Sequence, residues 1–205
     1  MKVAITGGIG SGKSYVCDLL AQRGIDIYNC DNEAKRLMAS SNSIHNKLVC
    51  AVGEEVYCDN KLNKPILAAF LLQSADNAAV INGIVHPEVA NDFLQSGKQW
   101  MECAILHSSG FDRLVDKVIC VVAPYEVRKK RIIQRDSISE AKAKEWIDCQ
   151  MSQEEMSAKS ECVVVNDDIG DLNRQIDNNL QAWAACEDDR ENIQKYINNS
   201  HITTN

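Results

Sequence analysis

The residues with the clearest chemical meaning lie near the start of the chain, in the run Gly7-Gly8-Ile9-Gly10-Ser11-Gly12-Lys13-Ser14. This run fits the pattern G-x-x-x-x-G-K-[ST], in which a glycine-rich loop cradles phosphate groups. Backbone N–H groups of such a loop, and of the helix that it opens, point toward phosphate oxygens. The Lys13 ammonium would then bridge the outer phosphates, and the Ser14 hydroxyl would hold Mg²⁺. The run therefore predicts a site for ATP or GTP.

Patterns that the sequence lacks exclude several classes of nucleotide-binding protein. GTPases identify guanine with N-K-x-D, whereas the stretches NKLV, NKLN and NKPI have no aspartate at the fourth position. Motor and transporter ATPases usually end a metal-binding strand in acidic residues, whereas VICVVAP ends in Ala123-Pro124. What remains favours a small phosphotransferase whose acceptor is another small molecule. A glycine-rich turn that binds nothing is the alternative explanation of the loop.

A carboxylate follows the second apolar run of the chain. Asp31 comes shortly after residues 25–29, which we expect to form a strand. In a doubly wound sheet the carboxyl ends of the strands line the ligand crevice, so Asp31 should face the same space as the phosphate loop. There it would accept a proton from an acceptor hydroxyl. A plain helix N-cap explains this aspartate equally well.

Three arginines in PYEVRKKRIIQRDSIS share one helical stripe. Arg128, Arg131 and Arg135 are spaced i, i+3, i+7, which places them along one side of a helix. Three guanidinium groups on one side indicate a surface that closes over phosphates and stabilises the charge of a transferring group. The alternative is a solvated basic face that pairs with nearby acids.

The apolar pattern alternates between short β-branched runs and longer helical stretches. Such alternation predicts an α/β fold with a parallel sheet of about five strands flanked by helices. The expected strands are 2–6, 25–29, 100–106, 117–123 and 161–166. The expected helices are 12–23, 31–40, 125–158 and 171–184, with a mostly helical segment at 44–98 broken at Gly53, Pro65, Gly83 and Pro87.

Composition limits the class of protein. The 205 residues suffice for one compact domain, and the net charge of −7 argues against broad nucleic-acid binding. No apolar run is long enough to cross a bilayer, and the chain begins with a strand pattern rather than a signal segment. The nine cysteines form no C-x-x-C pair, which favours free thiols in a reducing compartment. We therefore expect a cytoplasmic protein.

Taken together, these motifs resemble those of the dephospho-CoA kinase family over about residues 2 to 183. The opening TGGIGSGKS is followed by Asp31 after the second strand, in GIDIYNCDNEAKRL. A His-Pro pair stands in IVHPEV, and a lid pattern R-x-x-x-R-D begins at Arg131. The stretch ECVVVND is similar to the one that precedes the adenine-side loop of the family. Many kinases share the phosphate loop, but this combination is much more specific.

The resemblance implies a P-loop NTPase three-layer sandwich. It also implies transfer of the γ-phosphate of ATP to the ribose 3′-hydroxyl of dephospho-CoA, giving CoA and ADP with the help of Mg²⁺. One kinase domain would cover residues 1–186, with a core at 1–43, 99–124 and 160–186. Residues from about 56 to 98 would bind the acceptor, and residues from about 125 to 158 would form the lid. We expect the polar tail 187–205 to be a frayed helix or disordered.

The resemblance also implies roles for single residues. Asp31 would be the general base, Lys13 and Arg131 would stabilise the transferred phosphate, and Thr6 would lie beneath the loop near the reacting groups. The acceptor would contact Asp31, His86 and Arg131, and Ser14 would bind the metal. The expected nucleotide contacts are Gly8, Ile9, Gly10, Ser11, Gly12, Lys13, Ser14 and Tyr15, with Arg135, and with Asn166 near the adenine. A backbone-bonded histidine at a helix start is the alternative for His86.

Two stretches depart from the family pattern. Tyr15 follows Ser14 where a small residue is common. AILHSSGF carries Ala104, His107 and Ser108 where members often show P-L-L-F-E, so we expect no carboxylate role at 108.

Two other functions stay open, a nucleoside or nucleotide kinase and a nucleotide-binding regulatory module. We expect ATP and dephospho-CoA as substrates, no nucleic-acid or membrane partner, and a monomer or small homo-oligomer.

Overall fold

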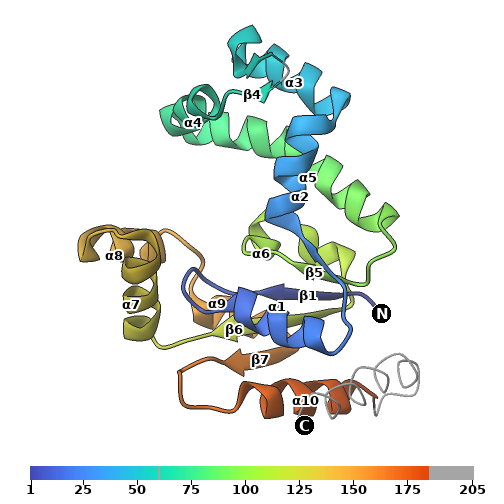
Figure 1. Cartoon of the computed structure of the whole chain (residues 1–205), viewed down its shortest axis with the longest axis vertical. Coiled ribbons are helices and arrows are strands. Elements are labelled where there is room, and N and C mark those ends of the chain that lie inside the picture. Colours follow the sequence, from blue (N-terminus) through green and yellow to red (C-terminus); the bar gives the residue numbers. More distant parts are fainter. Residues whose placement is uncertain (60, 185–205) are drawn as a thin grey trace. The chain divides into compact units, whose positions relative to one another are not determined.

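A computed structural model of the chain describes residues 1–59 and 61–184 (Figure 1). By internal contacts the chain divides into two units: Met1–Ile27 with the described residues from Gln99 onward, and Tyr28–Lys98. Residues 28–43, which we expected in the core, thus group with the helical segment. The expected tail at 187–205 lies outside the described residues.

The first unit is built on a parallel sheet. Its strands are β1 (Val3–Thr6), β5 (Trp100–Glu102), β6 (Lys117–Val122) and β7 (Cys162–Val165), and β2 (Ile27–Asn29) spans the unit boundary. The strand order is β2-β5-β1-β6-β7, and β1 is parallel to both β5 and β6. In this register Val3 lies opposite both Trp100 and Lys117. The predicted α/β fold with five parallel strands is confirmed.

Helices cover both faces of this sheet. The first unit contains α1 (Lys13–Gln22), α6 (Leu106–Ser109), η2 (Phe111–Leu114), α7 (Tyr125–Asp136), α8 (Glu140–Asp148), α9 (Gln153–Ala158) and α10 (Leu172–Ala184) (Figure 1). Ile119 and Val121 of β6 pack with α1 and α10 in one buried cluster. Cys120 lies between them in sequence and contacts Ser157 of α9. Because neighbouring strand residues face opposite sides, α9 covers the other face and completes three layers.

The second unit is helical. It contains α2 (Cys30–Ser40), α3 (Asn42–Val52), η1 (Glu54–Val56), β3 (Tyr57–Cys58), β4 (Lys61–Leu62), α4 (Lys64–Gln73) and α5 (Ala75–Gln95). The long helix α5 packs against α2, α3 and α4. Tyr28 and the fully buried Phe93 meet edge to face, with ring centroids 5.3 Å apart. No helix among the described residues is long and apolar enough to span a membrane.

Three expectations about the elements are wrong. Residues 125–158 do not form one continuous helix but the three helices α7, α8 and α9. Helix α5 continues through Gly83 and Pro87, where we expected breaks. A proline ring collides with the carbonyl four residues earlier, and that carbonyl here belongs to Gly83, which carries no side chain to restrict the adjustment. The strand expected at 100–106 ends at Glu102, and the chain turns into α6. The hairpin of β3 and β4 was not predicted within the helical segment.

Replacing Pro87 should stabilise the helical unit. Pro87→Ala restores an N–H donor inside α5, and we expect the free energy of unfolding to rise by about 1–3 kcal/mol. Urea unfolding monitored by circular dichroism measures this change. Pro65→Ala is the matched control, because Pro65 lies in the first turn of α4, where proline is well tolerated. A P87A protein that is no more stable than P65A would contradict the prediction.

Candidate active site

The phosphate loop connects the end of β1 to the start of α1. Gly12 is the N-cap of α1 and has φ 88° and ψ 28°, a left-handed conformation that favours glycine. No side chain caps α1, and its first turn contains no acidic residue. The N–H groups of this helix end are therefore suited to an anion, because nothing negative from the first turn competes for them.

The side chain of Lys13 reaches back to the glycine-rich loop that precedes it. Its Nζ donates to the carbonyl of Gly7 at 2.8 Å and to that of Gly8 at 3.4 Å. The next residue, Ser14, is exposed on the first turn of α1, and Tyr15 is also exposed. No group of three or more metal-ligating side chains occurs among residues 1–59 and 61–184. A site made of the Ser14 hydroxyl and phosphate oxygens is suited to Mg²⁺, because Mg²⁺ usually binds few protein ligands in addition to phosphates and waters.

Asn166 joins the loop to the segment after β7. It is 6% exposed, and its Nδ2 donates to the carbonyl of Ser11 at 2.9 Å. A Cβ on Gly12 would lie 2.1 Å from this Nδ2, so the two residues fit only while position 12 is glycine. The predicted nucleotide residue Asn166 is thus in direct contact with the phosphate loop.

Arg131 contacts both of these segments from α7. Its Nη1 donates to the carbonyls of Gly10 and Ser11 at 3.2 and 3.3 Å. Its Nη2 donates to Asn166 Oδ1 at 3.1 Å and pairs with the Asp168 carboxylate. The guanidinium therefore lies against loop carbonyls on the side where Asn166 stands.

The other two arginines of the stripe differ from each other. Arg128 is 4% exposed, and its Nε donates to the carbonyl of Ile9 at 2.9 Å. Burial lowers the pKa of the Arg128 guanidinium. Arg135 points to solvent and pairs with its neighbour Asp136. Two arginines of the stripe, Arg128 and Arg131, therefore contact the loop. Arg135 makes no contact with the loop among the described residues.

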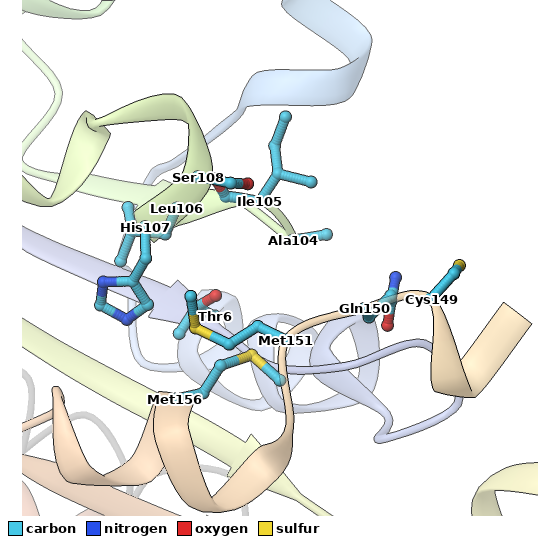
Figure 2. Close-up of a pocket in the computed structure, with 10 residues that line it drawn as sticks. All are labelled: Thr6, Ala104, Ile105, Leu106, His107, Ser108, Cys149, Gln150, Met151 and Met156. Carbon is cyan, nitrogen blue, oxygen red and sulfur yellow. The ribbon is translucent and has the colours of Figure 1, made fainter. Parts of the chain in front are cut away.

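Thr6 lines a cavity of about 200 Å³ in the first unit (Figure 2). Residues 104–108 form one side of this cavity, and residues 149–151 with Met156 form the other. The Thr6 hydroxyl is buried and has no hydrogen-bond partner among the described residues. A buried hydroxyl without a partner is costly, so this oxygen is suited to bind a polar group that enters the cavity.

His107, at the departure from the family pattern, lies at the edge of the same cavity (Figure 2). Its Nδ1 is 3.5 Å from the Asp112 carboxylate. Ser108 donates to the carbonyl of Ile105 at 3.1 Å. The AILHSSGF segment therefore supplies an imidazole and a hydroxyl here rather than a carboxylate.

Asp31 is exposed on the first turn of α2, in the helical unit. Our alternative explanation of Asp31 as an N-cap is wrong, because the N-cap is Asn29. The Asn29 side chain accepts the N–H of Asn32 at 2.8 Å. The capping function is thus performed two residues earlier, and the Asp31 carboxylate remains available for another role.

His86, the other predicted residue of the helical unit, lies within α5 and not at a helix start. The helix-start explanation is therefore wrong. The side chain is half-buried, and this burial lowers the pKa of its imidazole.

Comparison with known proteins decides the family. The sequence model of the dephospho-CoA kinase family matches residues 1–171. This chain belongs to the dephospho-CoA kinase family. A dephospho-CoA kinase of Bacteroides fragilis is 42% identical over 174 residues, which is 82% of this chain and 85% of the relative. One of Porphyromonas gingivalis is 41% identical over 143 residues, 67% of this chain and 71% of the relative.

Solved structures share the fold of this chain. A Thermus thermophilus crystal structure has a TM-score of 0.75 at 25% identity and covers 90% of this chain and 96% of its own. The dephospho-CoA kinase of Campylobacter jejuni has a TM-score of 0.64 at 22% identity, covering 89% of this chain and 98% of its own. A shikimate kinase of Acinetobacter baumannii shares the fold, with a TM-score of 0.53 at 14% identity, covering 91% and 94%. The chain therefore has the fold of P-loop kinases, in agreement with its membership of a kinase family.

Two features of the loop contacts do not follow from the sequence. The helical spacing places Arg128 on the stripe with Arg131 and Arg135, but it does not show that Arg128 is the buried one of the three. Gln150, between α8 and α9, accepts the N–H of Ile9 at 2.7 Å. No local pattern marks Gln150, because its partner lies 141 residues away in the chain.

Asn166 should matter more for stability than Asp168. Asn166→Ala removes two hydrogen bonds, one from Nδ2 to the Ser11 carbonyl and one from the Arg131 guanidinium to Oδ1, which should cost about 1–3 kcal/mol of unfolding free energy. Asp168→Asn loses only an ion pair whose carboxylate side chain is 67% exposed, which should cost less than about 1 kcal/mol. Asparagine also tolerates the left-handed φ of 68° at this position. Urea unfolding of both variants checks the order, and equal losses would contradict it.

Proposed function

We propose that this kinase transfers the γ-phosphate of ATP to the ribose 3′-hydroxyl of dephospho-CoA, giving CoA and ADP. The proposal rests above all on one observation. The chain carries a complete phosphate loop at the junction of β1 and α1, within a segment that matches the dephospho-CoA kinase family model. The names of the curated relatives support the choice of acceptor.

The phosphate loop explains how the nucleotide would be held. The N–H groups of residues 10–14 would bind the phosphates, because a left-handed Gly12 turns the chain into an uncapped helix. Lys13 Nζ, now on the carbonyls of Gly7 and Gly8, would exchange these for phosphate oxygens. Mg²⁺ held at Ser14 would neutralise charge on the phosphates.

Asn166 would lie near the adenine. Its contacts with Ser11 and Arg131 support this placement, because they join the segment after β7 to the loop. Arg131 would contribute positive charge close to the phosphates. Ile9, Tyr15 and Arg135 stay predictions as nucleotide contacts.

Asp31 would act as the general base. Its carboxylate is exposed at the start of α2 and is not needed as an N-cap, so it is suited to accept the proton of the acceptor hydroxyl. Thr6, whose hydroxyl has no hydrogen-bond partner within residues 1–59 and 61–184, would bind a polar group beside the reacting atoms. His86 and Arg131 would contact the acceptor.

We place the reaction in the cytoplasm. The eight cysteines within the described residues are all free thiols, as is usual in a reducing compartment.

The proposed acceptor is tested by ADP release from ATP. We expect ADP formation to depend on dephospho-CoA and to be at least about tenfold slower with a panel of nucleosides, nucleoside monophosphates and shikimate. Mass spectrometry of the product should show one phosphate added at the 3′ position of the ribose. Equal rates with a nucleoside would favour a nucleoside kinase, and hydrolysis independent of any acceptor would favour a regulatory nucleotide-binding module.

The role of Asp31 is tested by Asp31→Asn. We expect kcat to fall by about 100-fold or more while the Kd for ATP stays within about twofold, because a base acts only in the transfer step. Asp76→Asn is the matched control, since Asp76 is an exposed carboxylate in the first turn of α5. Near-normal turnover of the D31N protein would remove Asp31 from the mechanism.

A further inference from the structure

Ile9, in the middle of the phosphate loop, is held on three sides by the segment from α7 to Gln150. Its carbonyl accepts from Arg128 Nε at 2.9 Å, and its N–H donates to Gln150 Oε1 at 2.7 Å. Its side chain packs against a buried cluster of Ile132, Ala143 and Ile147 from α7 and α8. Backbone and side chain of this one residue are thus both fixed by the lid segment.

Arg128 is the charged member of this set, and its burial is unusual. The residue is 4% exposed, and its Nη2 is buried with no hydrogen-bond partner among the described residues. Burying a guanidinium with an unused donor destabilises a fold, because the lost hydration is only partly replaced. Such a group is expected to be retained for function rather than for stability.

The shape of the loop is complementary to Arg128. A Cβ on Gly8 would lie 2.5 Å from Arg128 Nη2 and 2.9 Å from its Cζ. Gly8 has no positive φ, so its backbone alone would accept alanine. The three nearest atoms to such a Cβ all belong to the Arg128 guanidinium. At this position, therefore, the glycine makes room for the guanidinium rather than for an unusual backbone.

Gly10 provides a contrast within the same loop. It has φ 77°, and a Cβ there would lie 2.7 Å from the backbone carbonyl oxygen of Arg128. Shortening the Arg128 side chain would relieve neither the strained φ nor the contact with the carbonyl. Gly8 and Gly10 thus differ in how they depend on the guanidinium.

We propose that Arg128 is a positioning residue for nucleotide binding, which holds the phosphate loop in its binding shape by occupying the space beside Gly8 and bonding the Ile9 carbonyl. The inference rests on the proposed function only in that the loop binds ATP. A loop fixed before the nucleotide arrives loses less conformational freedom on binding, so the affinity for ATP is higher. Arg128 acts through the loop and needs no contact with the phosphates.

A double-mutant cycle on the full chain tests this proposal through the Kd for ATP, measured by calorimetry. Arg128→Ala and Gly8→Ala should each raise the Kd by about tenfold, while Gly8→Ala in the R128A background should add less than about twofold. Gly10→Ala is the matched control, and its penalty should be the same in both backgrounds. Lys130→Ala, an exposed cation on the same helix, should leave the Kd within about twofold of the unchanged protein.

A merely structural role would give different results. It would lower the melting temperature and raise the KM for both substrates, whereas loop positioning raises the KM for ATP and leaves that for dephospho-CoA within about twofold. If R128A does not fold, the cycle is run with Arg128→Met, which keeps the aliphatic stem.

The proposal is overturned if R128A, or R128M in its place, binds ATP as the unchanged protein does. A Gly8→Ala penalty that is equal in both backgrounds overturns it as well. Failure of the unchanged protein itself to bind ATP would instead overturn the proposed function.

Discussion

Backbone amides bind phosphate well only when the loop that carries them is already fixed, and a loop of glycines cannot fix itself. Glycine has more conformational freedom to lose than any other residue and offers no side chain to pack. In this chain the loop is held from outside, by Asn166 on Ser11 and by Arg131 on Gly10 and Ser11. The order of the nucleotide site therefore depends on residues more than 100 positions away in the sequence.

The two faces of the central sheet differ. On the face of Ile119 and Val121 the contacts with α1 and α10 are apolar and continuous, as in an ordinary core. Thr6 and Cys120 lie side by side on the other face. Thr6 lines a cavity there, together with the thioether side chains of Met151 and Met156. The first face is closed by apolar packing, and the other face borders the cavity that Thr6 lines. Thr6 is the last residue of β1, and in α/β enzymes ligands bind at the carboxyl ends of the strands.

Sequence reasoning succeeded where the signal is local. The strand β6 is apolar from Val118 to Val122, and the phosphate loop is a fixed spacing of glycines before Lys13, so both could be located from a few residues. Local reasoning failed where a distant partner or a neighbouring residue determines whether a helix continues or where it begins. Pro87 is a helix breaker by its own chemistry, yet α5 continues because packing against three helices outweighs that preference. Asp31 is a good N-cap in general, but Asn29 stands two residues earlier and takes that position.

The cysteines give the chain a practical property. Burial raises the pKa of the Cys17 thiol to about 12, with the nearby Glu102 adding to the effect, so this thiol stays protonated and inert near neutral pH. Cys50, Cys58 and Cys149 are exposed. Of these three, Cys149 is the one that stands next to Gln150, the residue that bonds Ile9. An environment-sensitive fluorophore attached there would sit beside the nucleotide loop, and its emission would report ATP arrival once Cys50, Cys58 and Cys186, which lies outside the described residues, are replaced by serine.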